Sequence, residues 1–352
     1  MLNAEVTTQD EIRQLPEWNQ LDWKAIERYC YKLQKQIYRA SSRGNVRLVR
    51  RLQKLVLHSK AAKLLAVRCV TQDNQGKKTA GVDGVKSLSP QQRLKLADNL
   101  KLTGKGKPTR RVWIPKPGTD EKRPLGIPTM YDRAAQALAK MALEPEWEAK
   151  FEPNSYGFRP GRDSHDAREA IFNAIRYKAK FVLDADISKC FDKINHQAIL
   201  AKIGTFPKMR KQIKAWLKAG VLDGRERRTT DEGTPQGGVI SPLLANIALH
   251  GMEEKVMQYA RTLPGGKGAN KNALTLVRYA DDFVILHESL DVVKESQSII
   301  LEWSKTVGLE LKPAKTRLTH TLEPFGEEKP GFDFLGFNIR QYPVGKYSSG
   351  KN

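Results

Sequence analysis

The segment RYADDFVIL, residues 278–286, decides the fold, because it places two adjacent carboxylates between two apolar runs at 274–278 and 283–286. This order predicts a strand, a tight turn and a second strand, with Asp281 and Asp282 at the tip. Adjacent acids in an apolar hairpin are costly to desolvate unless a cation compensates them. Asp is also a favoured turn residue, so an Asp-Asp pair alone is compatible with an ordinary exposed turn.

A third acid comes from a separate segment, FVLDADISKCFD at residues 181–192. The run 181–183 predicts a short buried strand that ends in acids, among them Asp186. Magnesium takes oxygen ligands, and a pair of Mg²⁺ ions can activate a hydroxyl group and stabilise a leaving pyrophosphate. A strand ending in Asp186 beside a hairpin tip bearing Asp281 and Asp282 would supply such ligands. Asp184 shares a face with Asp186 if the strand alternates, and it is the weaker competing ligand.

Taken together, these motifs resemble those of reverse transcriptases, and in particular the group II intron-encoded reverse transcriptase and maturase branch. Residues 279–282, YADD, are similar to the YxDD signature of that family. Asp186, followed five residues later by Phe191, resembles the first catalytic motif. Further blocks resemble family motifs in the same order along the chain: TAGVDG at 79–84, NSYGFRPGR at 154–162, TPQGGVISP at 234–242, GLELKPAKT at 308–316 and FLGF at 334–337.

The resemblance implies an RNA-directed DNA polymerase that adds deoxynucleotides to a primer by two-metal nucleotidyl transfer with two Mg²⁺ ions. It implies that Asp186, Asp281 and Asp282 are the metal ligands, and that Lys315, with Lys312 as a neighbouring alternative, protonates the pyrophosphate. The nucleotide-binding residues that it implies are Lys116 and Arg123 for the triphosphate, Phe191 as a steric gate against a ribose 2′-OH, and Gln236 for the incoming nucleotide.

The same resemblance implies an α+β fold of right-hand polymerase type, with fingers and a palm whose small antiparallel sheet is backed by helices. We expect a helical, basic N-terminal extension over 1–78, fingers over 79–180, and a palm with the catalytic hairpin and primer grip over 181–342. Residues 343–352 are expected to be a tail, with the thumb or maturase domain absent.

Local patterns predict the individual elements. Apolar residues spaced by three and four predict one helix with Ile26, Tyr29, Cys30, Leu33 and Ile37 on its inner face, and a second helix with Leu48, Leu52 and Leu55 on one side. A basic hairpin is predicted within 103–130, helices over 131–149, 196–220, 243–260 and 291–307, a loop at 263–272, and short strands near 318 and 334–339.

Charge favours a polyanionic partner, because 61 Lys and Arg against 39 Asp and Glu give a net charge of +22. Arg47, Arg50 and Arg51 on the second helix are candidate RNA contacts, with an ordinary solvated helix face as the alternative. The expected partners are an intron RNA template, a DNA primer or target, and dNTPs. No membrane partner is expected, since no apolar run reaches the roughly 18–20 residues of a membrane span.

Three widely spaced cysteines indicate neither a disulfide framework nor a zinc site, and favour a reducing setting such as the bacterial cytoplasm or an organelle interior. Two other functions remain open from the sequence. One is a non-catalytic RNA-binding maturase that acts as a splicing cofactor. The other is a reverse transcriptase adopted by a retron or a CRISPR-type system.

Overall fold

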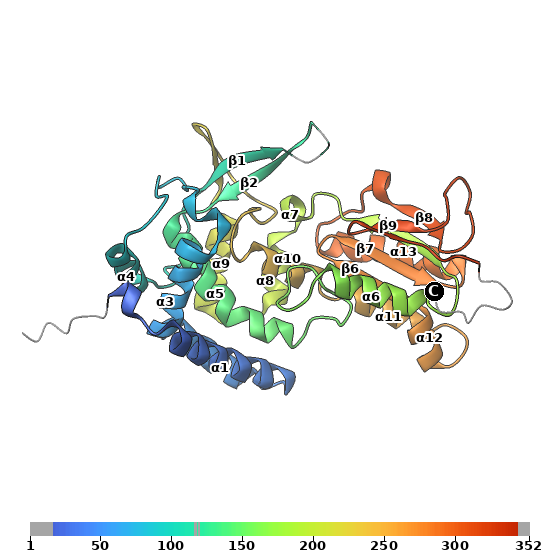
Figure 1. The fold of residues 1–352 in the computed structure, drawn as a ribbon, viewed down its shortest axis with the longest axis horizontal. Coiled ribbons are helices and arrows are strands. Elements are labelled where there is room, and N and C mark those ends of the chain that lie inside the picture. The colour runs from blue at the N-terminus through green and yellow to red at the C-terminus, as the bar shows by residue number, and fades with distance from the viewer. Residues whose placement is uncertain (1–16, 116–117, 119, 344–352) are drawn as a thin grey trace, which may run out of the picture.

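Packed helices form the N-terminal end of the molecule in the computed structural model, which describes residues 17–115, 118 and 120–343 (Figure 1). A short 3₁₀ turn, η1 (Trp18–Gln20), leads into α1 (Trp23–Ser42), α2 (Val46–His58) and α3 (Lys60–Arg68). All three helices contact the long helix α5 (Met130–Glu148). The predicted first helix is confirmed with Cys30, Leu33 and Ile37 buried, whereas Tyr29, expected on the same face, is 44% exposed.

The second helix buries Leu52 as predicted, but its buried face is rotated away from Leu48 and Leu55. Val49, Leu52 and Val56 are buried against the neighbouring helices, while Leu48 and Leu55 are exposed. Both sets have the three- and four-residue spacing of a helix face, so periodicity alone does not choose between them. The choice is made by packing against α1 and α5.

A mixed four-stranded sheet, here called the fingers sheet, has the order β2-β1-β4-β5, so two of its strands come from the range 181–342 that was expected to form the palm. The predicted basic hairpin is confirmed as β1 (Thr109–Pro115) and β2 (Lys122–Ile127), which pair antiparallel. β1 also pairs in parallel with β4 (Val221–Asp223), which continues into β5 (Glu226–Arg228). Between α3 and this sheet lie η2 (Cys69–Asp73), η3 (Gln75–Lys78) and α4 (Pro90–Asn99).

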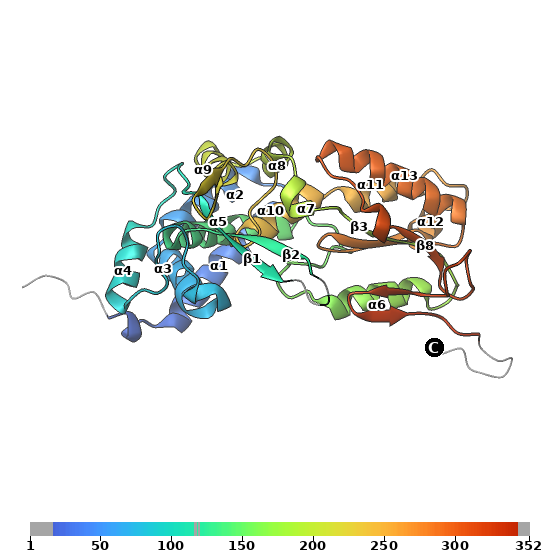
Figure 2. The same ribbon diagram turned by 90° about the horizontal axis from the view of Figure 1, so that it is seen from above.

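The palm is an antiparallel sheet in the order β6-β7-β3-β8 at the other end of the molecule. Its strands are β3 (Phe181–Asp186), β6 (Thr275–Tyr279), β7 (Asp282–His287) and β8 (Arg317–His320). Figure 2 shows helices on both sides of this sheet. The antiparallel sheet backed by helices confirms the predicted α+β fold.

Alternation along the palm strands divides the core between the two faces of the sheet. Leu183 and Phe283 pack with α13 (Leu290–Thr306). Val182 and Val284 pack with α6 (Ser164–Ile175) and with the hairpin formed by β9 (Phe332–Phe334) and β10 (Phe337–Ile339).

Some predicted elements were wrong in extent. The stretch 196–220 forms two helices, α8 (His196–Ile203) and α9 (Pro207–Leu217), because Gly204 adopts a left-handed φ of 51° and Pro207 starts the next helix. The stretch 243–260 likewise divides at Gly251 into α10 (Ser241–Leu249) and α11 (Met252–Ala260). Part of the predicted loop at 263–272 is helix α12 (Lys267–Ala273).

Short helices complete the palm: α7 (Cys190–Lys193) after β3, and η4 (Pro313–Lys315) before β8. Within the described residues, no helix combines the length and the apolar character that a membrane crossing requires.

Candidate active site

The register of the palm sheet brings the predicted acids together. Asp186 at the end of β3 lies directly opposite Asp282 at the start of β7. The backbone N–H of Ile187 donates to the carbonyl of Asp281 at 3.2 Å, which ties the end of β3 to the hairpin tip. Three acids from two distant segments therefore meet at one end of the two central strands, β3 and β7.

The tip of the hairpin is conformationally strained. Ala280, between Tyr279 and the two acids, has a φ of 56°, a left-handed conformation that costs an L-residue about 1–2 kcal/mol. Phe158 and Lys189, on the segments that flank the tip, also have positive φ angles, of 61° and 46°. Such strain persists only where the surrounding structure enforces it, and it clusters at functional sites.

The acids repel one another in a partly buried setting. Burial, together with the charges of Asp281 and Asp186, raises the pKa of Asp282 from 3.8 to about 6. Burial and the charge of Asp186 also raise the pKa of Asp281. The ammonium of Lys315 lies 2.8 Å from Asp186 Oδ2, and this contact raises the pKa of the lysine. One lysine against three carboxylates leaves negative charge that a further cation would compensate.

This donor set fits a hard divalent cation, because it offers carboxylate oxygens and no sulfur or nitrogen. In the described part of the chain, however, no group of three His, Cys, Asp or Glu side chains is already arranged to hold a metal. Asp186 is also engaged by Lys315 through its Oδ2 oxygen.

The competing acid, Asp184, has a separate partner. Its Oδ2 lies 2.8 Å from Arg317 Nη2 on β8, and it aligns with Val284 in the middle of β7 rather than with the hairpin tip. Asp184 thus has an ion-pair partner of its own, and its charge makes only a smaller contribution to the raised pKa of Asp282.

Two of the predicted nucleotide-contacting residues, Phe191 and Gln236, line a neighbouring cavity of about 320 Å³. Phe191 lies in α7, and its ring makes an edge-to-face contact with the ring of Phe158, with 5.8 Å between the ring centroids. The backbone N–H of Thr234 donates to the carbonyl of Phe191. The backbone carbonyl of Gln236 accepts from the N–H of Gly126 on β2 at 2.6 Å. The segment 234–238 thus connects the fingers sheet to Phe191.

Arg123 lies on β2 of the fingers hairpin. The positive charge of Arg123 reaches Asp281 and lowers the pKa of its carboxyl, against the larger effect of burial. Lys116 lies outside the described residues. Arg111 and Trp113 on β1 also line the cavity, and sequence reasoning did not single them out. The sequence signal that could have indicated them is a basic and an aromatic residue at alternate positions, on the same face of a predicted strand.

A family model described as reverse transcriptase (RNA-dependent DNA polymerase) matches residues 114–339, and one for the N-terminal domain of reverse transcriptase matches residues 18–100. The chain belongs to the reverse transcriptase family. The first match includes every predicted catalytic and nucleotide-contacting residue. Enzymes of this family are nucleotidyltransferases and are generally metal-dependent.

This reverse transcriptase is similar to curated proteins over most of its length. It is 32% identical over 308 residues to protein YkfC of Escherichia coli (strain K12), an alignment that covers 77% of this chain and 78% of YkfC. It is 31% identical over 328 residues to the group II intron-encoded protein LtrA of Lactococcus lactis subsp. cremoris, covering 76% of this chain and 53% of LtrA. The predicted resemblance to the group II intron-encoded branch is confirmed, and the chain spans about half the length of LtrA.

A telomerase structure from Candida albicans, in complex with a fragment of telomeric RNA, aligns with a TM-score of 0.49 at 14% identity. This alignment covers 70% of the present reverse transcriptase and 47% of the telomerase chain.

The three arginines predicted to contact RNA differ in their surroundings. Arg47 and Arg51 are exposed on α2. Arg50 forms a 2.5 Å ion pair with Glu146 of α5, whose side chain is 3% exposed, and donates to the Gly204 carbonyl. The structure thus engages Arg50 within the protein and leaves Arg47 and Arg51 facing solvent.

Proposed function

We propose that this reverse transcriptase is an active RNA-directed DNA polymerase that extends a primer along an RNA template in group II intron mobility. The observation that carries the proposal is the alignment of Asp186 with Asp282 beside Asp281. A protein that only binds RNA gains nothing from three carboxylates that repel one another at a strained turn. A polymerase needs them as metal ligands.

In this mechanism Asp186, Asp281 and Asp282 would hold two Mg²⁺ ions, and the bound metal would supply activation of the primer hydroxyl and stabilisation of the leaving pyrophosphate. Lys315 has a second role. Its ammonium pairs with Asp186, and the contact keeps its pKa above the ordinary value, so it carries a proton at neutral pH. This places a protonated ammonium beside the acids, where it would protonate the leaving pyrophosphate.

The nucleotide is selected in the adjoining cavity. The Phe191 ring, braced by Phe158, excludes a ribose 2′-OH, and Gln236 contacts the incoming nucleotide. Arg123 offers a fork of N–H donors to the triphosphate oxygens, a role that it shares with Lys116. Arg47 and Arg51 contact template or intron RNA through its phosphates.

Primer extension tests the proposal on poly(rA)/oligo(dT) with dTTP and Mg²⁺. Wild-type protein is compared with Asp186→Asn and Asp281→Asn, each of which removes a charge with little change in volume. We expect DNA synthesis to be lost in both variants while RNA affinity, measured separately by filter binding, stays at the wild-type level. Normal synthesis by either variant would remove that residue from the site.

Asp184→Asn is the matched control, because it removes a carboxylate from the same strand whose ion pair is with Arg317 and whose strand partner is Val284 rather than the hairpin tip. It is expected to retain DNA synthesis. The same assay separates the enzyme from a non-catalytic RNA-binding maturase, which would bind RNA but leave the primer unextended even as wild-type protein.

A further inference from the structure

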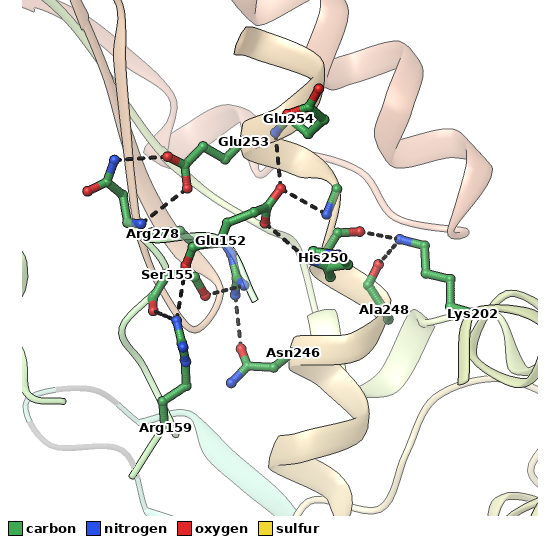
Figure 3. Close-up of polar contacts among 12 residues, drawn as sticks. Glu152, Ser155, Arg159, Lys202, Asn246, Ala248, His250, Glu253, Glu254 and Arg278 are labelled. Atoms are coloured by element: carbon green, nitrogen blue, oxygen red, sulfur yellow. Dashed lines mark hydrogen bonds and ion pairs between the residues drawn. The ribbon is translucent and has the colours of Figure 1, made fainter. Parts of the chain in front are cut away.

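Arg278 is a fully buried arginine immediately before the catalytic turn. It lies on β6 opposite Phe283, and its side chain is 1% exposed. Alternation along the strand places it on the face of the sheet opposite that of Tyr279 and Asp282. Figure 3 shows its side chain running toward Asn246 on α10 and Ser155.

The Arg278 guanidinium donates hydrogen bonds to three uncharged oxygens. Nη1 donates to the carbonyl of Ala280 at 2.8 Å and to Asn246 Oδ1 at 3.0 Å. Nη2 donates to Ser155 Oγ at 2.6 Å. No ion pair to this guanidinium occurs among the residues that the structure describes. Burying an arginine is costly, and a well-packed apolar residue would stabilise the fold as well or better.

The segment that carries Ser155, together with Asn246, packs around the turn. The segment 154–157 runs alongside β6, with the Arg278 N–H donating to the Asn154 carbonyl and the Arg278 carbonyl accepting from Tyr156 N–H, both at 2.9 Å. Asn246 Nδ2 donates to the carbonyl of Gly157 at 2.7 Å. A Cβ on Gly157 would lie 2.3 Å from the backbone nitrogen of Ala280, so only glycine allows this approach.

The charge of Glu152, and to a smaller extent that of Glu253, favours the charged form of Arg278 at longer range. Glu152 accepts from the N–H groups of Gly251 and Glu254 at 3.0 Å each, and Glu253 accepts from the side-chain amide of Asn154 at 2.9 Å. These contacts fix the start of α11 against the segment that carries Ser155 and Gly157 (Figure 3). The acceptors of Arg278 are therefore held in place by separate interactions.

We propose that Arg278 is a positioning residue for the active site. Its bond to the Ala280 carbonyl, braced by Asn246 and Ser155, holds the left-handed turn so that Asp281 and Asp282 face Asp186. This inference rests on the proposed function of the three acids. A lysine could not replace the arginine fully, because an ammonium lacks the planar fork that reaches several acceptors at once.

The test compares Arg278→Met with Arg159→Met in the full chain. Arg159 is a second buried arginine, paired with Glu148 at 2.8 Å, and it donates to the carbonyls of Glu152 and Ser155 without contacting the turn. Both variants lose a buried guanidinium, so both are expected to lower the melting temperature. Only Arg278→Met is expected to alter the turn.

The readouts include two that need no catalysis. Amide hydrogen exchange of the peptide 275–287 in the metal-free protein reports on the turn, and electron paramagnetic resonance reports Mn²⁺ binding to the protein alone. For Arg278→Met we expect faster exchange and about tenfold weaker Mn²⁺ affinity. In primer extension we expect kcat to fall while the KM for dTTP changes by less than about twofold. Arg159→Met is expected to match wild type in all of these except the melting temperature.

Wild-type exchange and Mn²⁺ affinity in Arg278→Met would overturn the proposal, as would equal changes in the two variants. If Arg278→Met does not fold, Arg278→Lys replaces it. That variant keeps the charge, and we expect intermediate exchange and Mn²⁺ affinity; wild-type behaviour would again overturn the proposal. If wild-type protein fails to extend a primer, the proposed function is refuted, while exchange and Mn²⁺ binding still decide whether Arg278 positions the turn.

Discussion

Replacing Asp282 with asparagine should stabilise the metal-free protein while abolishing its chemistry. Asp282→Asn removes the charge that burial, Asp281 and Asp186 all disfavour, and it leaves the volume of the side chain nearly unchanged. Because the folded-state pKa is raised, the folded protein binds more protons than the unfolded chain between pH 3.8 and about 6. Wild-type stability therefore falls as pH rises through this window, and the loss is complete above about pH 7.

The size of the effect follows from the pKa. A change from 3.8 to about 6 corresponds to about 3 kcal/mol, at about 1.36 kcal/mol for each pKa unit. Solvent screens a side chain that is only partly buried, so we expect about 1–2 kcal/mol in practice. That gain corresponds to a rise of about 2–4 °C in melting temperature for Asp282→Asn at pH 8.

Thermal unfolding in EDTA, followed by circular dichroism from pH 4.5 to pH 8.5, measures this difference. The advantage of Asp282→Asn should grow up to about pH 7 and then stay constant. Asp231→Asn, at an exposed aspartate, is the control for the change in net charge and should show no such gain. At a free Mg²⁺ concentration of about a hundred times Kd, wild type should gain about 2.7 kcal/mol and overtake the variant. A variant that is no more stable than wild type at pH 8 in EDTA would refute the electrostatic reasoning.

Three further predictions follow from other residues. The Mg²⁺ concentration for half-maximal DNA synthesis should rise as pH falls from 8 to 6, because Asp282 then takes up a proton in competition with the metal; a flat profile would contradict this. Phe191→Ala should raise UTP incorporation relative to dTTP on poly(rA) by about tenfold or more, whereas an unchanged ratio would remove the gate assignment. Combined Arg47→Ala and Arg51→Ala should flatten the slope of log K against log salt for RNA binding by about two units without changing the melting temperature. Arg50→Ala should instead destabilise the fold by about 1–2 kcal/mol, because it removes one of the two cations paired with buried Glu146 and leaves only Lys150. Equal effects of the three substitutions on melting temperature and salt slope would contradict this distinction.

Local patterns were sufficient to predict the catalytic hairpin and the strand before it. Asp281 and Asp282 stand between two apolar runs, and Asp186 ends a third, so turn chemistry and strand propensity agree over a few residues. The resemblance to reverse transcriptases then implied that these segments pair. The structure adds the register, with Asp186 opposite Asp282, and the raised pKa values that result from it.

Features that depend on which segments pack together were not predictable from the same patterns. The buried face of α2 and the engagement of Arg50 by Glu146 are set by a helix that lies far along the chain. Helical spacing fits either face of α2, and an arginine on a basic helix looks the same whether it faces solvent or a buried carboxylate.

Arg278 is the clearest case. In the sequence it is one charged residue at the end of an apolar run, with nothing to mark it as buried. Its acceptors, Ser155, Asn246 and the carbonyl of Ala280, come from three separate elements. The sequence by itself determined the periodicity and the turn chemistry, because these are properties of neighbouring residues, and the resemblance to reverse transcriptases singled out the three acids. Only the tertiary structure decided which polar groups satisfy one another, because a buried donor is paired by whichever acceptors packing brings within about 3 Å.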